Sequence, residues 1–326
     1  MTGAAELSER IRQAAEVIGG SGSLGGVCHE RPDGDALGSM LGFAASARLA
    51  GRSVHLAIPS PGAVPSRYRF LPTDLLSVPL SRSDVPQTVL AFDCASVDRL
   101  GNLDWLSQEA ENLVVVDHHV SNPGFGTIDL VDPGASATVE LVFDLLLELG
   151  WPVDEVVATC LLTGLVTDTG RFQYSNTTPR THRLAARLLE AGARPEVIGQ
   201  AVYEEEPFGL LSVAGAVLSR ARLDTERGVV WSVLYADDLE KASLNGEETE
   251  LLIDLVRLPR EAGVAMLIRE AEEGGVRVSL RSRGEVNVGA IAEALGGGGH
   301  HNAGGFAFEG DPSGALAAVL QRVPLG

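Results

Sequence analysis

The chain has 326 residues, of which 45% are hydrophobic and 21% charged, and its formal net charge is −19. This length is sufficient for two domains, and the composition is that of a globular protein rather than a disordered one. The negative charge argues against a protein that binds long nucleic acids, because such proteins carry basic stripes. It does not exclude a small anionic substrate, since divalent cations held by carboxylates would reverse the charge locally.

The first twenty residues have the spacing of an amphipathic helix, with Leu7, Ile11 and Ile18 on one face, and they lack the basic start of a signal peptide. No apolar run in the sequence reaches the roughly 20 residues that a membrane span needs. Three cysteines cannot form an even set of disulfides, which favours a reducing compartment. We therefore expect a cytoplasmic protein with no membrane partner.

From Gly25 to about Ala193, short apolar segments alternate with helical patterns. The expected strands are residues 25–28, 54–58, 88–92 and 113–116, and the expected helices are residues 36–49, 137–149, 153–166 and 179–190. Such alternation predicts an α/β domain whose parallel sheet has helices on both faces. In open sheets of this kind the functional site lies beyond the carboxyl ends of the strands.

The pattern changes after Tyr203, where three glutamates and Pro207 form a charged break before another helical stretch. A smaller α/β unit follows, with an expected strand at 228–235, a hairpin of 264–268 with 276–280, and a helix at 288–295. We therefore predict three parts: a catalytic domain at 1–203, a linker with a helix at 204–227, and a second domain at 228–326.

Aspartate and histidine side chains gather where the expected strands and helices of the first domain end. They are His29, Asp33, Asp35, Asp93, Asp117, His118, His119 and Asp168. Taken singly, Asp33 could cap a helix, Asp93 could belong to a strand-end turn, and Asp168 could belong to a helix C-terminal turn. Two adjacent imidazoles after a strand rarely serve a core, and the whole set predicts a site for two metal ions.

A second candidate site lies near the end of the chain. We expect the four glycines, Gly296 to Gly299, and His300 to form a loop, in which backbone N–H groups could converge on an anion. Arg281 could bind a phosphate through two N–H donors of its guanidinium group. A flexible linker is the alternative, which the regular elements on either side disfavour. Ser136 and Thr138 precede an expected helix, and capping of that helix is favoured over contact with substrate.

The residues of the first domain form four motifs in sequence order: 29–35, Asp93, 117–119 and Asp168. This set resembles the motifs of the DHH phosphoesterase superfamily, and within it those of the nano-RNase type. The tail, with Arg281-Ser282-Arg283 before the glycines and His300, is similar to the DHHA1 accessory domain of that superfamily. The resemblance covers about residues 24 to 310. It departs from the usual pattern at Glu30-Arg31 and at Gly304-Gly305, and neither departure affects a proposed ligand.

The resemblance implies specific roles for the residues of both domains. His29, Asp33 and Asp93 would hold one metal, and the second would be held by Asp35, Asp93, His118 and Asp168, with Asp93 bridging. Mixed carboxylate and imidazole ligands suit Mn²⁺. His119 would contact the phosphate or protonate the leaving oxygen, and Asp117 would orient an imidazole. An active site in the cleft between the domains would also use the substrate-binding residues Arg281, Ser282, Gly297, Gly298, Gly299 and His300.

The implied activity is hydrolysis of short oligoribonucleotides and dinucleotides to nucleoside 5′-monophosphates, with conversion of 3′-phosphoadenosine 5′-phosphate (pAp) to AMP as a further activity. A cyclic-dinucleotide phosphodiesterase is the first alternative, because it would use the same site. A family II inorganic pyrophosphatase is the second, although the glycines before His300 argue against it. A homodimer is expected because relatives often dimerise.

Overall fold

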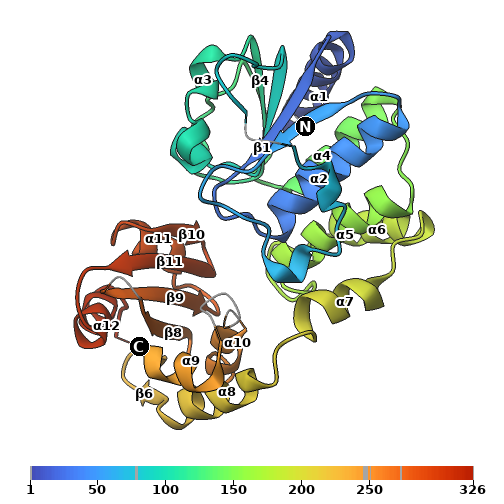
Figure 1. Ribbon diagram of the computed structural model, residues 1–326. Helices are drawn as coiled ribbons and strands as arrows, with labels where there is room; N and C mark the ends of the chain where they lie inside the picture. Colours follow the sequence, from blue (N-terminus) through green and yellow to red (C-terminus); the bar gives the residue numbers. More distant parts are fainter. Residues whose placement is uncertain (1, 78–79, 245–248, 250, 272–273, 326) are drawn as a thin grey trace. The chain divides into compact units, whose positions relative to one another are not determined.

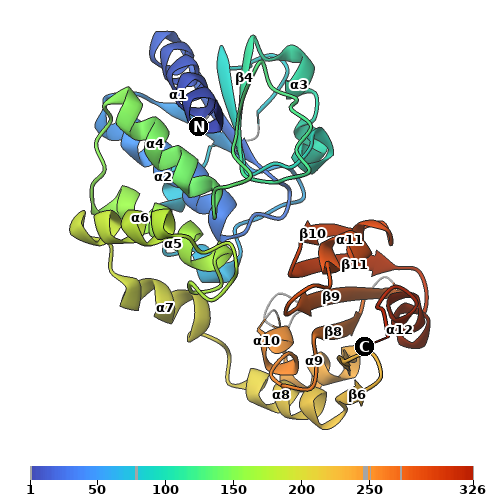
Figure 2. The same ribbon diagram turned by 180° about the vertical axis from the view of Figure 1, so that it is seen from behind.

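The computed structural model describes residues 2–77, 80–244, 249, 251–271 and 274–325, and it leaves the side chains of residues 2–4 and 300 undescribed. The chain forms two compact units, Met1–Glu204 (unit 1) and Glu205–Gly326 (unit 2), as Figures 1 and 2 show from opposite sides. Among the described residues, none of the helices combines the length and the apolar character that crossing a membrane requires.

Unit 1 is built around a five-stranded sheet with the strand order β2-β1-β3-β4-β5, in which all neighbouring strands are parallel. Buried β-branched and aromatic residues dominate the inner strands, as expected for a sheet covered on both faces. The strands are β1 Leu24–Cys28, β2 Val54–Ala57, β3 Thr88–Phe92, β4 Asn112–Asp117 and β5 Ile128–Val131.

Helices cover both faces of this sheet because alternate strand residues point to opposite sides. Phe92 and Val116 pack on one side, and Ala91 and Val115 pack on the other. The first side carries α1 Thr2–Gly20, α2 Gly34–Leu49, α4 Thr138–Leu149 and α5 Glu155–Asp168, and Figure 1 shows the shorter α3 Leu106–Glu109 on the other side. The remaining elements of unit 1 are α6 Pro179–Glu190, α7 Pro195–Tyr203 and the 3₁₀ turns η1 Ser66–Tyr68, η2 Thr73–Leu75 and η3 Val97–Leu103.

Helices α2 and α5 pack with their backbones in close approach, and glycines make this possible. A Cβ atom on Gly38 would lie 2.4 Å from the carbonyl oxygen of Cys160, and one on Gly164 would lie 2.9 Å from Oδ1 of Asp35. Both distances are too short for a side chain, so these positions require glycine. The packing brings the first turn of α2 close to α5.

Unit 2 contains a six-stranded sheet with the order β10-β11-β9-β8-β7-β6, in which β7 and β8 are parallel and the other neighbours antiparallel. Its strands are β6 Arg222–Asp224, β7 Val229–Leu234, β8 Val264–Glu270, β9 Val276–Ser282, β10 Gly298–His300 and β11 Ala303–Phe308. Its helices are α8 Gly209–Ser219, α9 Ala236–Ala242, α10 Leu252–Val256, α11 Val288–Glu293 and α12 Pro312–Leu320. Residues of α8 and α10 share one apolar cluster with the sheet, and residues of α11 and α12 share another.

The predicted α/β class is confirmed: unit 1 has a parallel sheet between helices, and unit 2 has a second, mixed sheet. The structure differs from the expectation at the glycine-rich segment, which we expected to be a loop. Its last three residues form β10, paired with residues 303–305 of β11. Strand pairing satisfies the backbone groups there, although glycine is unfavourable in strands. The boundaries 1–203, 204–227 and 228–326 stay a prediction, as does the cleft site.

The close approach of α2 and α5 predicts that alanine substitutions at two helical glycines have opposite effects on the free energy of unfolding. Gly38→Ala should lower the free energy of unfolding by about 1–3 kcal/mol, because the new methyl group meets a backbone oxygen that cannot move away. Gly199→Ala, also inside a helix but with no atom within 4 Å of the new Cβ, should raise it by about 0.5–1 kcal/mol. Urea unfolding of both variants measures the difference, and similar values for the two would contradict the packing argument.

Candidate metal centre

Three neighbouring strands deliver the first candidate side chains to one edge of the sheet. His29 follows β1, Asp93 follows β3, and Asp117 ends β4 directly before His118 and His119. Because β1, β3 and β4 are adjacent and parallel, their carboxyl ends lie at the same edge.

Helix ends supply the remaining candidates. Asp33 is the N-cap residue of α2, Asp35 lies in its first turn, and Asp168 is the last residue of α5. The prediction for Asp33 left helix capping as the alternative, and the side chain does cap the helix: its Oδ1 accepts hydrogen bonds from the backbone N–H groups of Asp35 at 3.0 Å and Ala36 at 3.1 Å. The same oxygen also faces His29, so capping and metal binding are compatible here.

Three sets of side chains lie close enough to hold a metal ion, and within each set the potential ligand atoms are within 4.8 Å of one another. In the first set, Nε2 of His29 lies 3.9 Å from Oδ1 of Asp33 and 3.7 Å from Oδ2 of Asp93. We call this set the His29 group.

The second set consists of Asp35, His118 and Asp168, and we call it the His118 group. Nε2 of His118 lies 3.9 Å from Oδ2 of Asp35 and 3.5 Å from Oδ2 of Asp168. In the third set, Asp93 joins His118 and His119. The structure therefore brings together all six predicted metal ligands, which come from four separate segments of the chain.

Asp93 lies between the two groups. Its Oδ2 faces His29 at 3.7 Å, and its Oδ1 faces His118, also at 3.7 Å. The backbone of Asp93 has φ of 57°, in the left-handed region that few residues other than glycine adopt. Its N–H donates to the carbonyl of Val116 at 2.9 Å, which holds this conformation at the sheet edge. Such strained residues cluster at functional sites, and this position suits a bridging carboxylate.

Because the carboxylates and imidazoles are buried close together, their pKa values depend on burial and on one another's charges. Burial, together with repulsion from Asp93, raises the pKa of Asp35 well above its ordinary value. Burial likewise raises the pKa of Asp168 to about 7, although the nearby His118 opposes this. For His118, burial works to lower the pKa, but attraction to Asp168, Asp93 and Asp35 outweighs it and raises the pKa to about 10.

The same competition acts on the other side of the centre. Burial would lower the pKa of His29, but the nearby carboxylates of Asp33 and Asp93 raise it to about 9. Burial would raise the pKa of Asp93, whereas His29, His119 and His118 hold it well below its ordinary range. Protons on imidazoles thus offset carboxylate charge, and bound cations would do the same.

The donor set fits divalent metal ions. Each of the three sets combines carboxylate oxygens with imidazole nitrogens, a mixture that suits Mn²⁺ and similar ions. Oδ2 of Asp168 is buried and accepts no hydrogen bond from any described residue. A buried carboxylate oxygen without a donor is uncommon in proteins, and a cation would satisfy it.

Helix α4 supports the centre in a way that the sequence did not reveal. We expected Ser136 or Thr138 to cap this helix, but Ala137 occupies the N-cap position and makes no side-chain capping bond. Instead, the carboxylate of Asp35 accepts from the backbone N–H groups of Thr138 at 2.6 Å and Val139 at 3.1 Å. A carboxylate from another helix therefore takes the capping role, over a separation of about a hundred residues that local sequence patterns do not report.

Further polar side chains surround the ligands and the neighbouring His119. The hydroxyl of Thr138 donates to Oδ1 of Asp93 at 2.9 Å. Nδ1 of His119 lies 2.7 Å from Oδ1 of the fully buried Asp117, whose Oδ2 accepts from Nδ2 of Asn122 at 2.7 Å. Asn122 was not predicted, and only its position three residues after His119 could have drawn attention to it.

In unit 2 the predicted substrate-binding residues lie on or next to β9 and β10, the two strands that flank β11. Ala303 of β11 pairs with His300 of β10 on one side and with Arg281 of β9 on the other. Gly298 and Gly299 belong to β10, Gly297 precedes it, and Ser282 ends β9. The side chain of His300 lies outside the described residues. The sheet thus places the two predicted segments on either side of β11.

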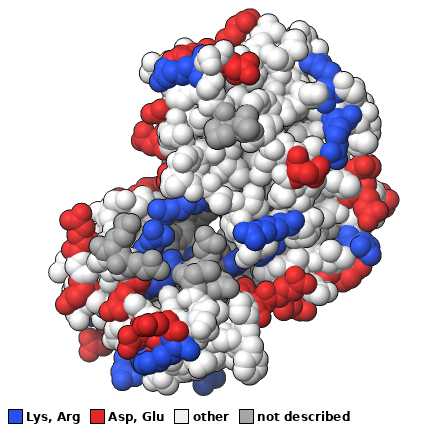
Figure 3. Space-filling view, viewed as in Figure 1, with Lys and Arg blue, Asp and Glu red and all other residues white. Residues whose placement is uncertain are grey.

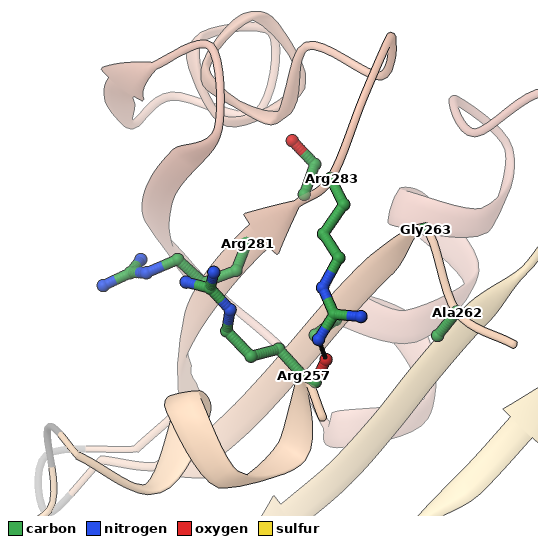
Figure 4. Close-up of a pocket in the computed structure, with 7 residues that line it drawn as sticks. Arg257, Ala262, Gly263, Arg281 and Arg283 are labelled. Atoms are coloured by element: carbon green, nitrogen blue, oxygen red, sulfur yellow. Dashed lines mark hydrogen bonds between the residues drawn. The ribbon is translucent and has the colours of Figure 1, made fainter. Parts of the chain in front are cut away.

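Arg281 lines a small hollow together with Arg257 and Arg283, as Figure 4 shows. Its Nη1 donates to the carbonyl of Leu280 at 3.0 Å, and its buried Nε has no hydrogen-bond partner among the described residues. Arg283 donates to the carbonyl of Arg257. A guanidinium with an unused donor beside two others is suited to an anion. In the space-filling view, acidic side chains are spread over both units, and basic ones gather in a few places (Figure 3).

Comparison with known proteins identifies the family of this chain. The model of the DHH family, N-terminal domain, matches residues 27–165, and the model of the DHHA1 domain matches residues 226–323. The bifunctional oligoribonuclease and PAP phosphatase NrnA of Thermus thermophilus is 34% identical over 320 residues, which cover 97% of this chain and 94% of that protein. The chain belongs to the DHH family.

Other known proteins are also similar to this chain. NrnA of Bacillus subtilis is 28% identical to this DHH-family chain, covering 90% of it and 92% of the relative. The cyclic-di-AMP phosphodiesterase GdpP of Bacillus subtilis is 33% identical over 60% of this chain, but the match covers only 29% of GdpP. A solved structure of an exopolyphosphatase-related protein from Bacteroides fragilis has the same fold, with a TM-score of 0.88, 24% identity, and coverage of 97% of this chain and 95% of that one.

The raised pKa values predict how the metal-free protein responds to pH. His29 and His118 keep their protons to about pH 9 and about pH 10 when folded, whereas in the unfolded chain they lose them near pH 6.5, roughly. Their stabilisation is therefore complete below the unfolded pKa and is lost as pH rises. With EDTA present, the free energy of unfolding should fall between about pH 7 and about pH 8, by up to about 1.4 kcal/mol for each proton retained.

His118→Gln provides the control for this measurement, because it removes one of the two retained protons. Urea unfolding at both pH values should give a smaller decrease for the variant than for the wild-type protein. Equal decreases would show that His118 is not held in its protonated form by the surrounding carboxylates.

Proposed function

We propose that this DHH-family chain is a metal-dependent phosphoesterase that hydrolyses short oligoribonucleotides and dinucleotides to nucleoside 5′-monophosphates, and pAp to AMP. One observation carries the proposal: six carboxylate and imidazole side chains from four segments meet at the carboxyl edge of the sheet. Similarity over nearly the whole chain to proteins named as bifunctional oligoribonuclease and PAP phosphatase supports this choice of substrates.

The proposed cofactor is a pair of divalent cations, with Mn²⁺ favoured by the mixed oxygen and nitrogen ligands. The His29 group and the His118 group would each hold one ion, with Asp93 between them. The chemistry that such a pair supplies is activation of water for in-line attack and neutralisation of phosphoryl charge. The protein's own contribution is to fix the carboxylates and imidazoles at the sheet edge.

His119 is the proposed acid of the reaction. Its hydrogen bond with Asp117 fixes the ring, and the same bond, with the nearby Asp93, raises its pKa although burial works against this. With the Nδ1 hydrogen directed to Asp117, Nε2 is the nitrogen that can donate to a phosphoryl or leaving oxygen. Asp117, itself held by Asn122, acts as a positioning residue for this imidazole.

Unit 2 is the proposed source of substrate selection. Metal ligands contact only the scissile phosphate, so they do not separate a dinucleotide from a simple phosphate ester. Arg281, Ser282 and the segment from Gly297 to His300 lie on or next to the two strands that flank β11, and they offer backbone and guanidinium donors. Binding of a terminal phosphate or base there would favour short substrates over polymers.

A cyclic-dinucleotide phosphodiesterase is the alternative function that a specific observation favours. The partial match to GdpP covers 60% of this chain. The same ligands serve both reactions, so the distinction lies in the substrate and not in the centre. The match to NrnA extends over both units, which is why the linear substrates are placed first.

A comparison of substrates tests the proposal. The Mn²⁺-loaded protein should hydrolyse a linear diribonucleotide and pAp, with a lower rate on a cyclic dinucleotide and little on pyrophosphate. Nucleoside 5′-monophosphate should be the only product from the diribonucleotide that carries a 5′-phosphate. A higher kcat/KM on the cyclic dinucleotide would establish the alternative, and hydrolysis of pyrophosphate alone would overturn both.

The same assay checks the centre through Asp93→Asn, which keeps the shape of the side chain but removes the shared carboxylate. Turnover should fall by several orders of magnitude, because both water activation and charge neutralisation depend on the pair of ions. Asp84→Asn changes an exposed aspartate of the same unit and should leave the rate unchanged. Full activity in the Asp93 variant would contradict a bridging role.

Arg281→Ala tests selection by unit 2. Loss of a charge-assisted contact costs about 1.5–3 kcal/mol, so kcat/KM for a dinucleotide should fall by about one to two orders of magnitude. A small chromogenic phosphodiester should lose much less. Arg277→Ala, an exposed arginine of the same strand, is the matched control and should change neither substrate. Equal losses on both substrates would mean that Arg281 serves the fold or the chemistry.

A further inference from the structure

One short segment, residues 135–139, contacts the side chains of the His118 group. The carbonyl of Ala135 lies 3.3 Å from Nδ1 of His118, so this ring nitrogen donates to it and Nε2 faces the carboxylates. The backbone N–H groups of Thr138 and Val139 hold both oxygens of Asp35. Two of the three ligands in the group are therefore oriented by the 135–139 segment.

Asn176 connects the third ligand to the same segment. Its Nδ2 donates to the carbonyl of Ser136 at 2.9 Å and to the carbonyl of Asp168 at 3.1 Å. Its Oδ1 is buried and has no hydrogen-bond partner among the described residues. The amide thus acts here through its two donors alone, and it ties the end of α5, which carries Asp168, to the 135–139 segment.

The 135–139 segment is itself fixed from the side of α4. The hydroxyl of Ser136 donates to Oε1 of Glu140 at 2.6 Å, and the hydroxyl of Thr181 donates to the same oxygen at 3.0 Å. Nε of Arg180 lies 3.1 Å from the other oxygen of Glu140, which is only 1% exposed. This buried network gives the segment one position, and hence gives one position to the ligands that it holds.

The His29 group has less support. The side chain of Asp33 is 55% exposed, and the hydrogen bonds that it accepts from described residues come from the first turn of its own helix. Nδ1 of His29 is buried without a hydrogen-bond partner among the described residues, so no acceptor there fixes the ring. Metal-binding histidines are usually oriented by a hydrogen bond from the second ring nitrogen. The two groups therefore differ in how far they are ordered before a metal binds.

We infer that the His118 group binds a divalent cation more tightly than the His29 group, and that Asn176 is the positioning residue responsible for the tight site. Ligands that are already ordered lose less conformational entropy on binding, which favours the first ion at the His118 group. This inference rests on the proposed function, because it concerns the metals which that function requires.

Titration of the metal-free, full-length protein with Mn²⁺, followed by the electron paramagnetic resonance signal of free Mn²⁺, tests the inference. The wild-type protein should bind in two steps of different affinity. Asn176→Ala should weaken the tight step by about 10- to 100-fold, the usual effect of removing a residue that orients a metal ligand, and should leave the weak step unchanged. Asn176→Asp, which keeps the size but loses the donors, should act in the same direction.

Asn122→Ala is the matched control. Like Asn176, Asn122 donates two hydrogen bonds from Nδ2, to the carbonyl of Cys94 at 3.0 Å and to Asp117 at 2.7 Å. Through Asp117, however, Asn122 supports His119 and not the His118 group. Both Mn²⁺ steps should be unchanged in this variant. In the Asn176 variant, hydrolysis should need more Mn²⁺ for half-maximal rate and return to the wild-type kcat at saturation, which a folding defect would not produce.

The outcomes separate this inference from the proposed function. Two-step binding in the wild-type protein with an unchanged tight step in Asn176→Ala overturns the inference alone, as does an equal loss in both steps or a loss in Asn122→Ala. Absence of Mn²⁺ binding by the wild-type protein overturns the proposed function as well. Selective weakening of the tight step supports the inference.

Discussion

The structure of unit 1 depends on burying several carboxylates beside one another. Asp35, Asp93 and Asp117 are almost inaccessible to solvent, and Asp168 lies in the same cluster. Isolated buried charges of one sign are strongly unfavourable, so they persist only where cations, protons or hydrogen-bond donors surround them. The imidazoles of His29 and His118 and the N-terminal amides of α4 supply part of this compensation, and the proposed metals would supply the rest.

The fold provides the positions that this compensation requires. A parallel sheet places the ends of β1, β3 and β4 side by side, and the glycines between α2 and α5 bring the first turn of α2 close to α5. Asp35 connects these two features, because it belongs to α2 and accepts hydrogen bonds from the first turn of α4. A change in the helix packing would therefore move a ligand, and the stability of the domain and the geometry of the centre are linked.

Much of the fold and of the proposed centre could be predicted from the sequence because the signals are local. A β-branched run that stops at Asp117 indicates a strand end, and parallel strand ends converge. The supporting residues could not be predicted in this way. Thr138 and Asn176 act on ligands through contacts that depend on how α4 and α5 pack, and no spacing in the sequence reports that. The edge strand β10 was missed because a run of glycines resembles a flexible loop, whereas its pairing with β11 is a long-range feature.

Anomalous diffraction at the manganese absorption edge, from crystals of the Mn²⁺-loaded protein, tests the central claim most directly. If two ions share Asp93, there should be two peaks about 3.5–4 Å apart. Both should lie next to the carboxylate of Asp93, one beside His29 and the other beside His118. A single peak in fully loaded crystals, or two peaks that do not share Asp93, would contradict it.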